Sequence, residues 1–374
     1  MKILYSCLSK SWGGMEMFTI TAIKQLLKRN VSVELLCIKE SRIHIEASNS
    51  GIILHPIKIS GYIHPFSALK IASIIRRSNY DLVHTQASKD LWLLVPALNL
   101  LGSKIPLILT KQVGSYIVKK DKLHRWIYNR VTYALAISNV IKKNLLDTCP
   151  LTEEKIILLH NGIDTEKFNA NKVDIKKFRN EYKIKESETL IGMLARFSPG
   201  KGHEEFLSAA KILNGKYNTL KFVIVGEASR GENSYADKIK KLSNDLGLSN
   251  VIFTGYRADT PEVLGGMDIF VFPSHNEAFG IALAEAMAMG KPSVCSNADG
   301  VLDIAVEGET SFLFENKNAD SLAQKIEMLI DSPKTRQDFG IEARKRAVEY
   351  FELGKLTERV IEIYNSLVRK GRPA

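Results

Sequence analysis

Two glutamates stand eight residues apart within residues 274–290. An apolar run just before them, residues 269–272, predicts a buried strand, and the run rich in Ala, Met and Leu after Gly280 predicts a helix. A turn between a strand and a helix N-terminus offers free backbone N–H groups to a phosphate. Glu277 and Glu285 would lie more than one helical turn apart. This separation suits an elongated ligand with phosphates in its middle and hydroxyl groups at both ends, the layout of a nucleotide diphosphate sugar.

A second candidate ligand-binding turn, residues 196–202, reads Arg-Phe-Ser-Pro-Gly-Lys-Gly and follows an apolar run at residues 190–194. Arg196 and Lys201 could converge on a diphosphate, since Arg forks onto two oxygens and Lys acts as a mobile point charge. Such a pair would stabilise the negative charge that develops on a departing diphosphate. A solvated basic turn is the alternative interpretation. The sequence has no Asp-x-Asp motif, so we expect no bound metal and no metal requirement.

The sequence from Glu277 to Ala288, Glu-Ala-Phe-Gly-Ile-Ala-Leu-Ala-Glu-Ala-Met-Ala, closely resembles the signature of the family 4 retaining glycosyltransferases of GT-B fold (glycosyl transferases group 1). An ordinary Ala-rich helix of a parallel α/β domain is the alternative for this segment. The contacts that the resemblance implies are Glu277 with sugar hydroxyls, Glu285 with the ribose, and backbone N–H groups near Phe279, Gly280 and Ile281 with phosphate or sugar oxygens.

The resemblance extends to other turns. It makes Arg196 and Lys201 the metal-free clamp on the leaving diphosphate, and it places Gly226 and Tyr256, each after a predicted strand, near the nucleobase and ribose. The pair Gly13 and Gly14 is similar to the family's Gly-Gly-x-Glu loop in the catalytic cleft. This pair is not a Gly-x-Gly-x-x-Gly fingerprint, so a nicotinamide cofactor is disfavoured.

Two positions depart from the family pattern. Gln112 stands where many members have a histidine that contacts the transferring sugar, and a Gln side chain cannot act as a general base. A retaining front-face reaction, in which the leaving phosphate takes the acceptor proton, does not strictly need that base. Residues 298–300, Ala-Asp-Gly, replace a loop that usually carries two glycines and a Glu, so no donor preference is inferred from this loop.

Apolar strands alternate with amphipathic helices, which predicts parallel βαβ units in doubly wound sheets. In the first half we expect strands at residues 3–7, 31–38, 82–84, 106–110 and 134–138, and helices at 17–29, 69–77, 91–101, 121–132 and 139–146. In the second half we expect strands at residues 190–194, 220–225, 251–253, 269–272, 293–295 and 312–314.

The length of 374 residues favours two domains. The resemblance implies an α/β GT-B architecture, two Rossmann-like domains that face a central cleft. The first, residues 1–165, would bind the acceptor, and the second, residues 166–353, would bind the nucleotide sugar. The Asn-Gly turn at Asn161 resembles the interdomain hinge, and the last helix, within residues 354–374, would pack back on the first domain.

The positive charge is concentrated in the first half. Residues 1–165 hold 22 Lys and Arg against 11 Asp and Glu, whereas residues 166–374 hold 30 of each. No zinc, recognition-helix or aromatic-interleaved basic pattern indicates a nucleic-acid partner. An anionic membrane or an anionic lipid-linked acceptor explains the excess, and residues 119–126, a basic run that ends in Trp126, suit either. Lysines that only keep the protein soluble are the alternative.

These observations predict a retaining, metal-independent hexosyltransferase with no cofactor. Its substrates would be a nucleotide diphosphate sugar and a glycan or lipid-linked acceptor of cell-surface polysaccharide or lipopolysaccharide synthesis. The four cysteines are scattered, no apolar run could span a bilayer, and the start lacks the features of a signal peptide. We therefore expect a cytoplasmic protein that contacts the inner face of the membrane. A nucleotide-sugar 2-epimerase and a non-catalytic partner subunit are the alternatives.

Overall fold

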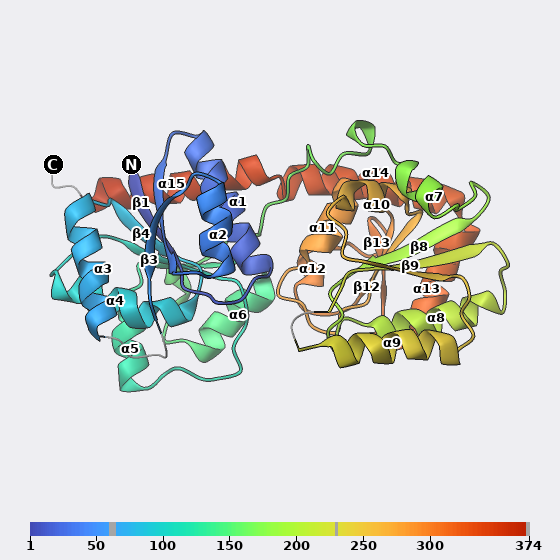
Figure 1. Cartoon of the computed structure of the whole chain (residues 1–374), viewed down its shortest axis with the longest axis horizontal. Helices are drawn as coiled ribbons and strands as arrows, with labels where there is room; N and C mark the ends of the chain where they lie inside the picture. The colour runs from blue at the N-terminus through green and yellow to red at the C-terminus, as the bar shows by residue number, and fades with distance from the viewer. Residues whose placement is uncertain (60–64, 229–230, 372–374) are drawn as a thin grey trace. The chain divides into compact units, whose positions relative to one another are not determined.

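The computed structural model describes residues 1–59, 65–228 and 231–371 (Figure 1). The chain forms two compact α/β units. Unit 1 comprises residues 1–160 and 354–374, and unit 2 comprises residues 161–353. The sequence prediction set this division after residue 165.

The described part of unit 1 contains a seven-stranded parallel sheet in the order β3-β2-β1-β4-β5-β6-β7. Its strands are β1 (Lys2–Cys7), β2 (Ser32–Ile38), β3 (Ile53–Ile57), β4 (Leu82–Thr85), β5 (Leu107–Lys111), β6 (Tyr133–Ala136) and β7 (Ile156–Leu158). The inner strand β4 is buried along its whole length, as expected for a parallel sheet with helices on both faces. The edge strand β3 carries Pro56, a residue that edge strands tolerate.

Helices cover both faces of this sheet. Those on one face are α1 (Gly14–Lys28), α2 (Arg42–Asn49) and, from the end of the chain, α15 (Leu353–Gly371), whose apolar side chains share one core cluster with β1 and β2. On the other face α3 (Pro65–Ser78) and α4 (Leu91–Leu100) lie together (Figure 1). The remaining helices are the short η1 (Ser88–Asp90) and η2 (Glu153–Lys155), α5 (Lys122–Asn129) and α6 (Asn139–Thr148).

The described part of unit 2 contains a six-stranded parallel sheet in the order β10-β9-β8-β11-β12-β13. Its strands are β8 (Thr189–Leu194), β9 (Leu220–Val225), β10 (Val251–Gly255), β11 (Ile269–Phe272), β12 (Ser293–Ser296) and β13 (Ser311–Phe314). On one face lie α8 (His203–Asn214), α9 (Asn233–Asp245) and α13 (Ala319–Asp331), and on the other α10 (Thr260–Gly266), α11 (Ile281–Ala288) and α14 (Pro333–Tyr350) (Figure 1). Shorter segments are η3 (Ala170–Lys172), α7 (Lys177–Glu181) and α12 (Val301–Ile304).

Each sheet has one topological switch point. In unit 1 the neighbouring strands β1 and β4 lead to helices on opposite faces, and in unit 2 β8 and β11 do the same. The loops that leave such a strand pair diverge, which opens a crevice at the carboxyl ends of the strands. One ligand-binding crevice is therefore expected in each unit.

The predicted α/β fold is confirmed. Every predicted strand and every predicted first-half helix is present, with ends displaced by no more than four residues. Residues 372–374, part of the predicted last helix, lie outside the described residues. The prediction omitted β3, β7 and α2, which are short. Edge strands need little apolar sequence, so their pattern is weak.

Tyr364 ties α15 to the sheet of unit 1. It is fully buried, and its hydroxyl group lies 2.5 Å from Nδ1 of His84 in β4. Nε2 of the same imidazole lies 2.7 Å from Thr110 Oγ1 in β5. Burial lowers the pKa of His84 to about 3, so this histidine is a neutral core residue.

Replacing Tyr364 with Ala should lower the free energy of unfolding of unit 1 by about 3–5 kcal/mol, the cost of removing a large buried ring. The chain's three tryptophans, Trp12, Trp92 and Trp126, all lie in unit 1, so their fluorescence in urea follows this unit. The control Glu362→Ala changes an exposed position of α15 and should alter stability by less than about 0.5 kcal/mol. Equal unfolding midpoints for the two variants would contradict the packing of α15 in the unit 1 core.

Candidate functional site

The main predicted ligand-binding turns of unit 2 meet at its switch point. Residues 195–202 follow β8, and residues 273–280 follow β11; we call them the switch-point loops. Because β8 and β11 pair side by side, with Ile191 opposite Ile269, both loops leave the same edge of the sheet next to each other. The topology therefore brings together two segments that are about 80 residues apart in the sequence.

A close approach of backbone to backbone holds the switch-point loops together. Gly202 has a φ of +78°, and a Cβ atom there would stand 2.2 Å from the carbonyl oxygen of Pro273. The backbone N–H of His275 donates to the carbonyl oxygen of Gly200 at 2.8 Å. Only glycine fits at position 202, because a side chain would require both an unfavourable φ and a displacement of the other loop.

This contact places Lys201 beside Glu277. The Lys201 Nζ atom lies 2.7 Å from Glu277 Oε2, and the two side chains are 23% and 20% exposed. Both side chains are thus mostly packed against the protein but still reach solvent. A cation suits phosphate oxygens, and a carboxylate accepts hydrogen bonds from hydroxyl groups. The two halves of a sugar diphosphate need these two kinds of group.

A third loop supports the backbone of Glu277. The N–H of Gly300, after β12, donates to the carbonyl oxygen of Glu277 at 2.9 Å. A Cβ atom at Gly300 would stand 2.5 Å from the carbonyl oxygen of Ala278. The loop at residues 298–300, which departs from the family pattern, therefore still has a glycine where its packing requires one.

Further residues that hold the β11 loop in place were not predicted from the sequence. His275 Nε2 lies 2.8 Å from Glu205 Oε1 in α8, and the carbonyl oxygen of His275 accepts from Asn316 Nδ2 at 2.8 Å. Ser296 Oγ donates to the carbonyl oxygen of Ser274 at 2.6 Å. None of these partners lies in a recognisable motif. The only signal was a histidine two residues before Glu277.

The N-terminus of α11 lies next to the ion pair. Gly280 caps this helix with a φ of +111°, and the first N–H groups of a helix, here near Ile281, have no partner within it. Phe279 is different: its side chain is buried and lies edge-on against Phe351, with ring centroids 5.7 Å apart. Its ring therefore anchors the loop, and only its backbone is left for the predicted ligand contact.

Glu285 lies on the second turn of α11 and is half-buried. Within the described ranges, no side chain or backbone N–H is within hydrogen-bond or ion-pair distance of its carboxylate. Burial raises the pKa of the Glu285 carboxyl group to about 7, against the opposing charge of Lys167. A carboxylate in this setting is suited to accept hydrogen bonds from a ligand hydroxyl.

Arg196, Gly226 and Tyr256 lie at the ends of three adjacent strands. Gly226 has a φ of +145°, and a Cβ atom there would stand 2.0 Å from the carbonyl oxygen of Ala195. Its N–H donates to the carbonyl oxygen of Gly255 at 3.0 Å. Gly226, at the end of β9, therefore contacts the ends of both neighbouring strands, β8 and β10. Arg196 and Tyr256 are both exposed there, and Tyr256 is 65% exposed.

Gly13, Gly14 and Gln112 lie in unit 1. Gly13 has an extended φ of −166°, and a Cβ atom at Gly14 would meet no atom within 4 Å, so the packing of unit 1 requires glycine at neither position. The space at Gly14 is open to a ligand. Gln112 is buried, and its Nε2 donates to Gln86 Oε1 at 3.1 Å.

The described residues contain neither a candidate metal site nor a candidate membrane span. No group of three or more His, Cys, Asp or Glu within residues 1–59, 65–228 and 231–371 is arranged to hold a metal ion. No helix in the same ranges is both long enough and apolar enough to cross a bilayer.

Two family models match this chain. The model of the glycosyl transferases group 1 matches residues 174–346, and the model of Glycosyltransferase Family 4 matches residues 12–167. Together they cover most of both units.

Similar proteins are known from sequence and from structure. The capsular polysaccharide biosynthesis glycosyltransferase CapM of Staphylococcus aureus is 31% identical over 247 residues, which is 64% of this chain but only 63% of CapM. The UDP-Gal:alpha-D-GlcNAc-diphosphoundecaprenol alpha-1,3-galactosyltransferase of Escherichia coli is 26% identical over 81% of this chain and 79% of its own length. The crystal structure of a glycosyltransferase from Rickettsia africae ESF-5 superposes with a TM-score of 0.90 at 25% identity and covers 99% of both chains.

The burial of Glu285 predicts a pH-dependent stability. Between pH 4.5, the ordinary pKa, and about 7 the folded chain retains a proton that the unfolded chain releases. The free energy of unfolding should therefore fall as the pH rises through this window. The variant Glu285→Gln lacks the titration, so it should be about 1–3 kcal/mol more stable than the wild type at pH 8 and equally stable near pH 4.5.

Urea unfolding at both pH values, followed by far-UV circular dichroism, measures this difference. Glu309→Gln, at an exposed position of the same unit, is the matched control and should follow the wild type at both pH values. If Glu285→Gln also follows the wild type, the Glu285 carboxyl group titrates normally and is not desolvated.

Proposed function

Since this chain belongs to the family 4, group 1 glycosyltransferases, we propose that it transfers a hexose from a nucleotide diphosphate sugar to a glycan or lipid-linked acceptor, with retention of anomeric configuration and without a metal ion. The observation that carries this proposal is the Lys201–Glu277 pair at the switch point of unit 2, beside the N-terminus of α11. We further propose a role in the synthesis of cell-surface polysaccharide or lipopolysaccharide. The activities named for the capsular and diphosphoundecaprenol-linked relatives support that role.

The donor would extend along the switch-point loops. Lys201 and Arg196 would hold the diphosphate, and the first N–H groups of α11 would add hydrogen bonds to its oxygens. Glu277 would accept from hydroxyl groups of the hexose, and Glu285, one turn and more along α11, would accept from the ribose. Before the donor arrives, Lys201 and Glu277 neutralise each other. The bound donor would then offer each of them a partner of its own.

In the proposed reaction the bond between the anomeric carbon and the leaving phosphate oxygen breaks. The acceptor hydroxyl oxygen bonds to that carbon from the same face, and its proton passes to a phosphate oxygen. While the bond to the anomeric carbon breaks and before the proton arrives, negative charge develops on the leaving phosphate oxygen, and the cationic Arg196 and Lys201 would stabilise this charge. No protein base is required at Gln112, whose amide cannot take up the proton.

Transfer can be measured with a panel of nucleotide sugars that starts with UDP-galactose, the donor named for the Escherichia coli relative. The acceptor probe is prenyl-diphosphate-linked N-acetylglucosamine, and the buffer contains EDTA. Proton NMR of the product then reports the anomeric configuration. Sugar transfer in EDTA with retention is the expected result. Transfer only with added Mg²⁺, or with inversion, would contradict the proposed mechanism.

The variants Lys201→Ala and Glu277→Ala should each lower kcat by about 100-fold or more, since each removes a contact that strengthens as charge develops. Two exposed residues of unit 2 give matched controls, Lys211→Ala and Glu309→Ala, which should keep the wild-type rate. If both site variants work at the control rate, the assignment of the site is wrong.

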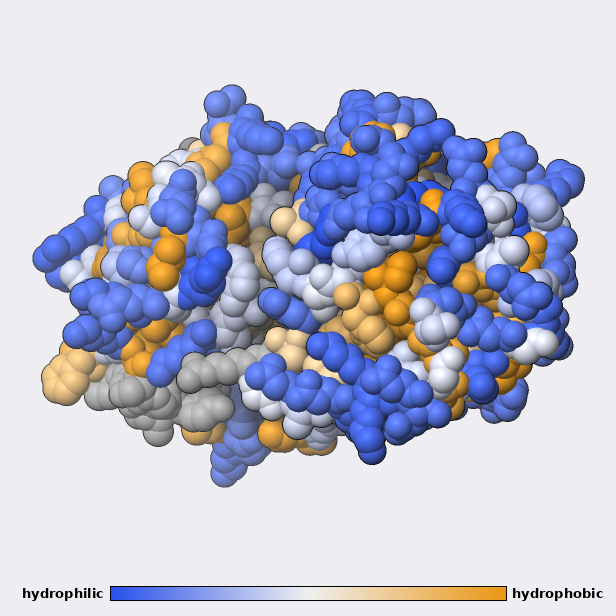
Figure 2. Space-filling model, turned by 45° about the vertical axis from the view of Figure 1, so that its right-hand side comes forward, coloured by the Kyte–Doolittle hydropathy of each residue, from blue (hydrophilic) through white to orange (hydrophobic). Residues whose placement is uncertain are grey.

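We also propose that unit 1 contacts the anionic inner face of the cell membrane. By sequence, unit 1 holds 27 Lys and Arg against 12 Asp and Glu, whereas unit 2 holds 25 against 29. Figure 2 shows a mostly hydrophilic face that hydrophobic side chains interrupt in separate patches. Basic residues near an apolar patch favour an anionic membrane over a neutral one.

The β5–α5 loop, residues 112–121, and the first turns of α5 combine both features. Tyr116 is 99% exposed and Ile117 70% exposed, and Trp126 in α5 is 45% exposed. The loop is nonetheless held to α6, since Ser115 and Asn144 exchange two hydrogen bonds of 2.9 Å. The apolar side chains are thus presented outward from a fixed backbone, flanked by the basic residues Lys119, Lys120, Lys122 and Arg125.

Binding to vesicles tests this contact. The double variant Ile117→Asp/Trp126→Asp should bind vesicles of phosphatidylglycerol and phosphatidylcholine at least about 10-fold more weakly than the wild type, in a sedimentation assay at physiological salt. Leu100→Asp is the control: it places one negative charge at an exposed apolar position where α4 ends, outside the loop and α5. If Leu100→Asp weakens binding as much as the double variant, this loop is not the contact.

A further inference from the structure

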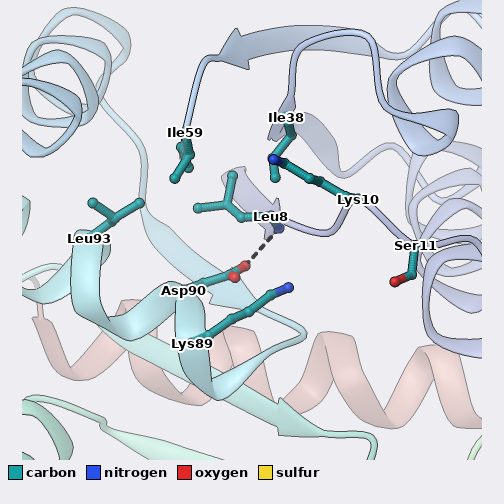
Figure 3. A pocket seen from close by; sticks show the side chains of 8 residues that line it. All are labelled: Leu8, Lys10, Ser11, Ile38, Ile59, Lys89, Asp90 and Leu93. Carbon is teal, nitrogen blue, oxygen red and sulfur yellow. Dashed lines mark hydrogen bonds between the residues drawn. The ribbon is translucent and has the colours of Figure 1, made fainter. Parts of the chain in front are cut away.

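A cavity occupies the switch point of unit 1 (Figure 3). Its lining comes from the loops after β1 and β4 and from the ends of β2 and β3: Leu8, Lys10, Ser11, Ile38, Ile59, Lys89, Asp90 and Leu93. Its volume is about 240 Å³. The loops after β1 and β4 diverge here for the same topological reason that opens the site of unit 2. The cavity therefore lies where open α/β sheets bind their ligands.

The cavity has two unlike sides. Figure 3 shows Ile59 and Leu93 toward one side, Ser11 and Lys89 toward the other, and Leu8, Ile38 and Asp90 between them, while the Lys10 side chain extends from the side of Ser11 toward Ile38. The apolar side offers a surface for C–H groups. The two lysines offer cationic ammonium groups, which bind phosphate as point charges. A ligand that fills this cavity must therefore combine an apolar face with an anionic group.

Asp90 is the feature that demands a hydrogen-bond donor. This residue is 1% exposed, and its Oδ2 atom accepts from Ser6 Oγ at 2.9 Å, from Leu8 N at 3.0 Å and from Thr85 Oγ1 at 3.1 Å. Its Oδ1 atom is buried with no hydrogen-bond partner among the described residues. A buried carboxylate oxygen without a donor is costly, so a ligand that supplies a hydroxyl group would be stabilised there.

We propose that this cavity binds a phosphorylated monosaccharide unit, the sugar phosphate at the end of the acceptor, with Lys10 and Lys89 on its phosphate and Asp90 Oδ1 on a ring hydroxyl group. The C–H face of the sugar ring lies against Leu8 and Leu93. The assignment rests on the proposed transferase function, because it makes the unit 1 cavity the acceptor subsite. The cavity is smaller than the range of about 300–1,000 Å³ for larger ligands, so it holds one sugar unit and not a whole nucleotide sugar.

Methyl NMR with labelled isoleucine tests this subsite directly, because the side chains of Ile38 and Ile59 line the cavity. The probe is N-acetylglucosamine 1-phosphate, titrated beside N-acetylglucosamine and inorganic phosphate. The sugar phosphate should shift both methyl signals saturably. It should do so at concentrations about 10-fold or more below those at which either half of it acts, because the charged and the hydroxyl contacts add.

Variants assign the shift to the cavity. Lys10→Ala/Lys89→Ala should weaken the binding of the sugar phosphate about 10-fold or more, the loss expected for charge-assisted hydrogen bonds. Lys104→Ala removes an exposed lysine of unit 1 outside the cavity and should bind as the wild type does. Asp90→Asn should also weaken binding. The double lysine variant tests the same cavity without changing this buried residue, so a folding defect in Asp90→Asn would not affect the conclusion.

Several outcomes would overturn the proposal: unchanged Ile38 and Ile59 signals, equal affinity for inorganic phosphate, or wild-type affinity in Lys10→Ala/Lys89→Ala. A prenyl-diphosphate-linked sugar that competes for the same shifts identifies the lipid-linked form as the occupant, and failure to compete leaves the free sugar phosphate. Binding of a nucleoside diphosphate to the same samples reports on unit 2. Its loss alone would contradict the proposed donor site and leave the cavity assignment standing.

Discussion

The close approach of Gly202 to Pro273 is the constraint on which the unit 2 site depends. It places the backbones of the two switch-point loops in direct contact, so no residue with a side chain could occupy position 202. The ion pair between Lys201 and Glu277 follows directly, since these residues flank the contact on the two loops. Gly226 and Gly300 act in the same way on the neighbouring loops. These three glycines thus set how closely the loops approach one another, and the polar contacts of Ser274 and His275 hold the β11 loop in that position.

The sequence predicted more of this arrangement than of its support. Alternating strands and helices predicted both sheets, and strand–turn–helix patterns around Lys201 and Glu277 placed these residues at strand ends. The interactions of His275 with Glu205 and Asn316 could not be predicted, because they join elements far apart in the chain and leave no local pattern. The edge strand β3 was missed for a related reason: with Pro56 in a five-residue strand, it lacks the long apolar run of an inner strand.

Each unit has its candidate ligand site at the topological switch point of its sheet, but the residues at the two switch points differ in chemistry. At the switch point of unit 2, Lys201 and Glu277 pair with each other and stand ready for a ligand with phosphates and hydroxyl groups. At the switch point of unit 1, Asp90 is held by three donors on one oxygen and has none on the other, within a cavity with an apolar side and a cationic side. The concentration of positive charge in unit 1 would suit an anionic acceptor, and with the near-balanced charge of unit 2 the proposed donor binding would depend on a few positioned side chains.

In the proposed function, unit 2 binds a nucleoside diphosphate through side-chain cations and without a metal. The most direct test is the thermal stability of the protein with UDP, GDP, ADP and CMP, first in EDTA and then in Mg²⁺, because a ligand that binds only the folded state raises the Tm. We predict that one diphosphate raises the Tm in EDTA and that Mg²⁺ adds little to the rise. A rise that requires Mg²⁺, or no rise with any of the nucleotides, would contradict the account.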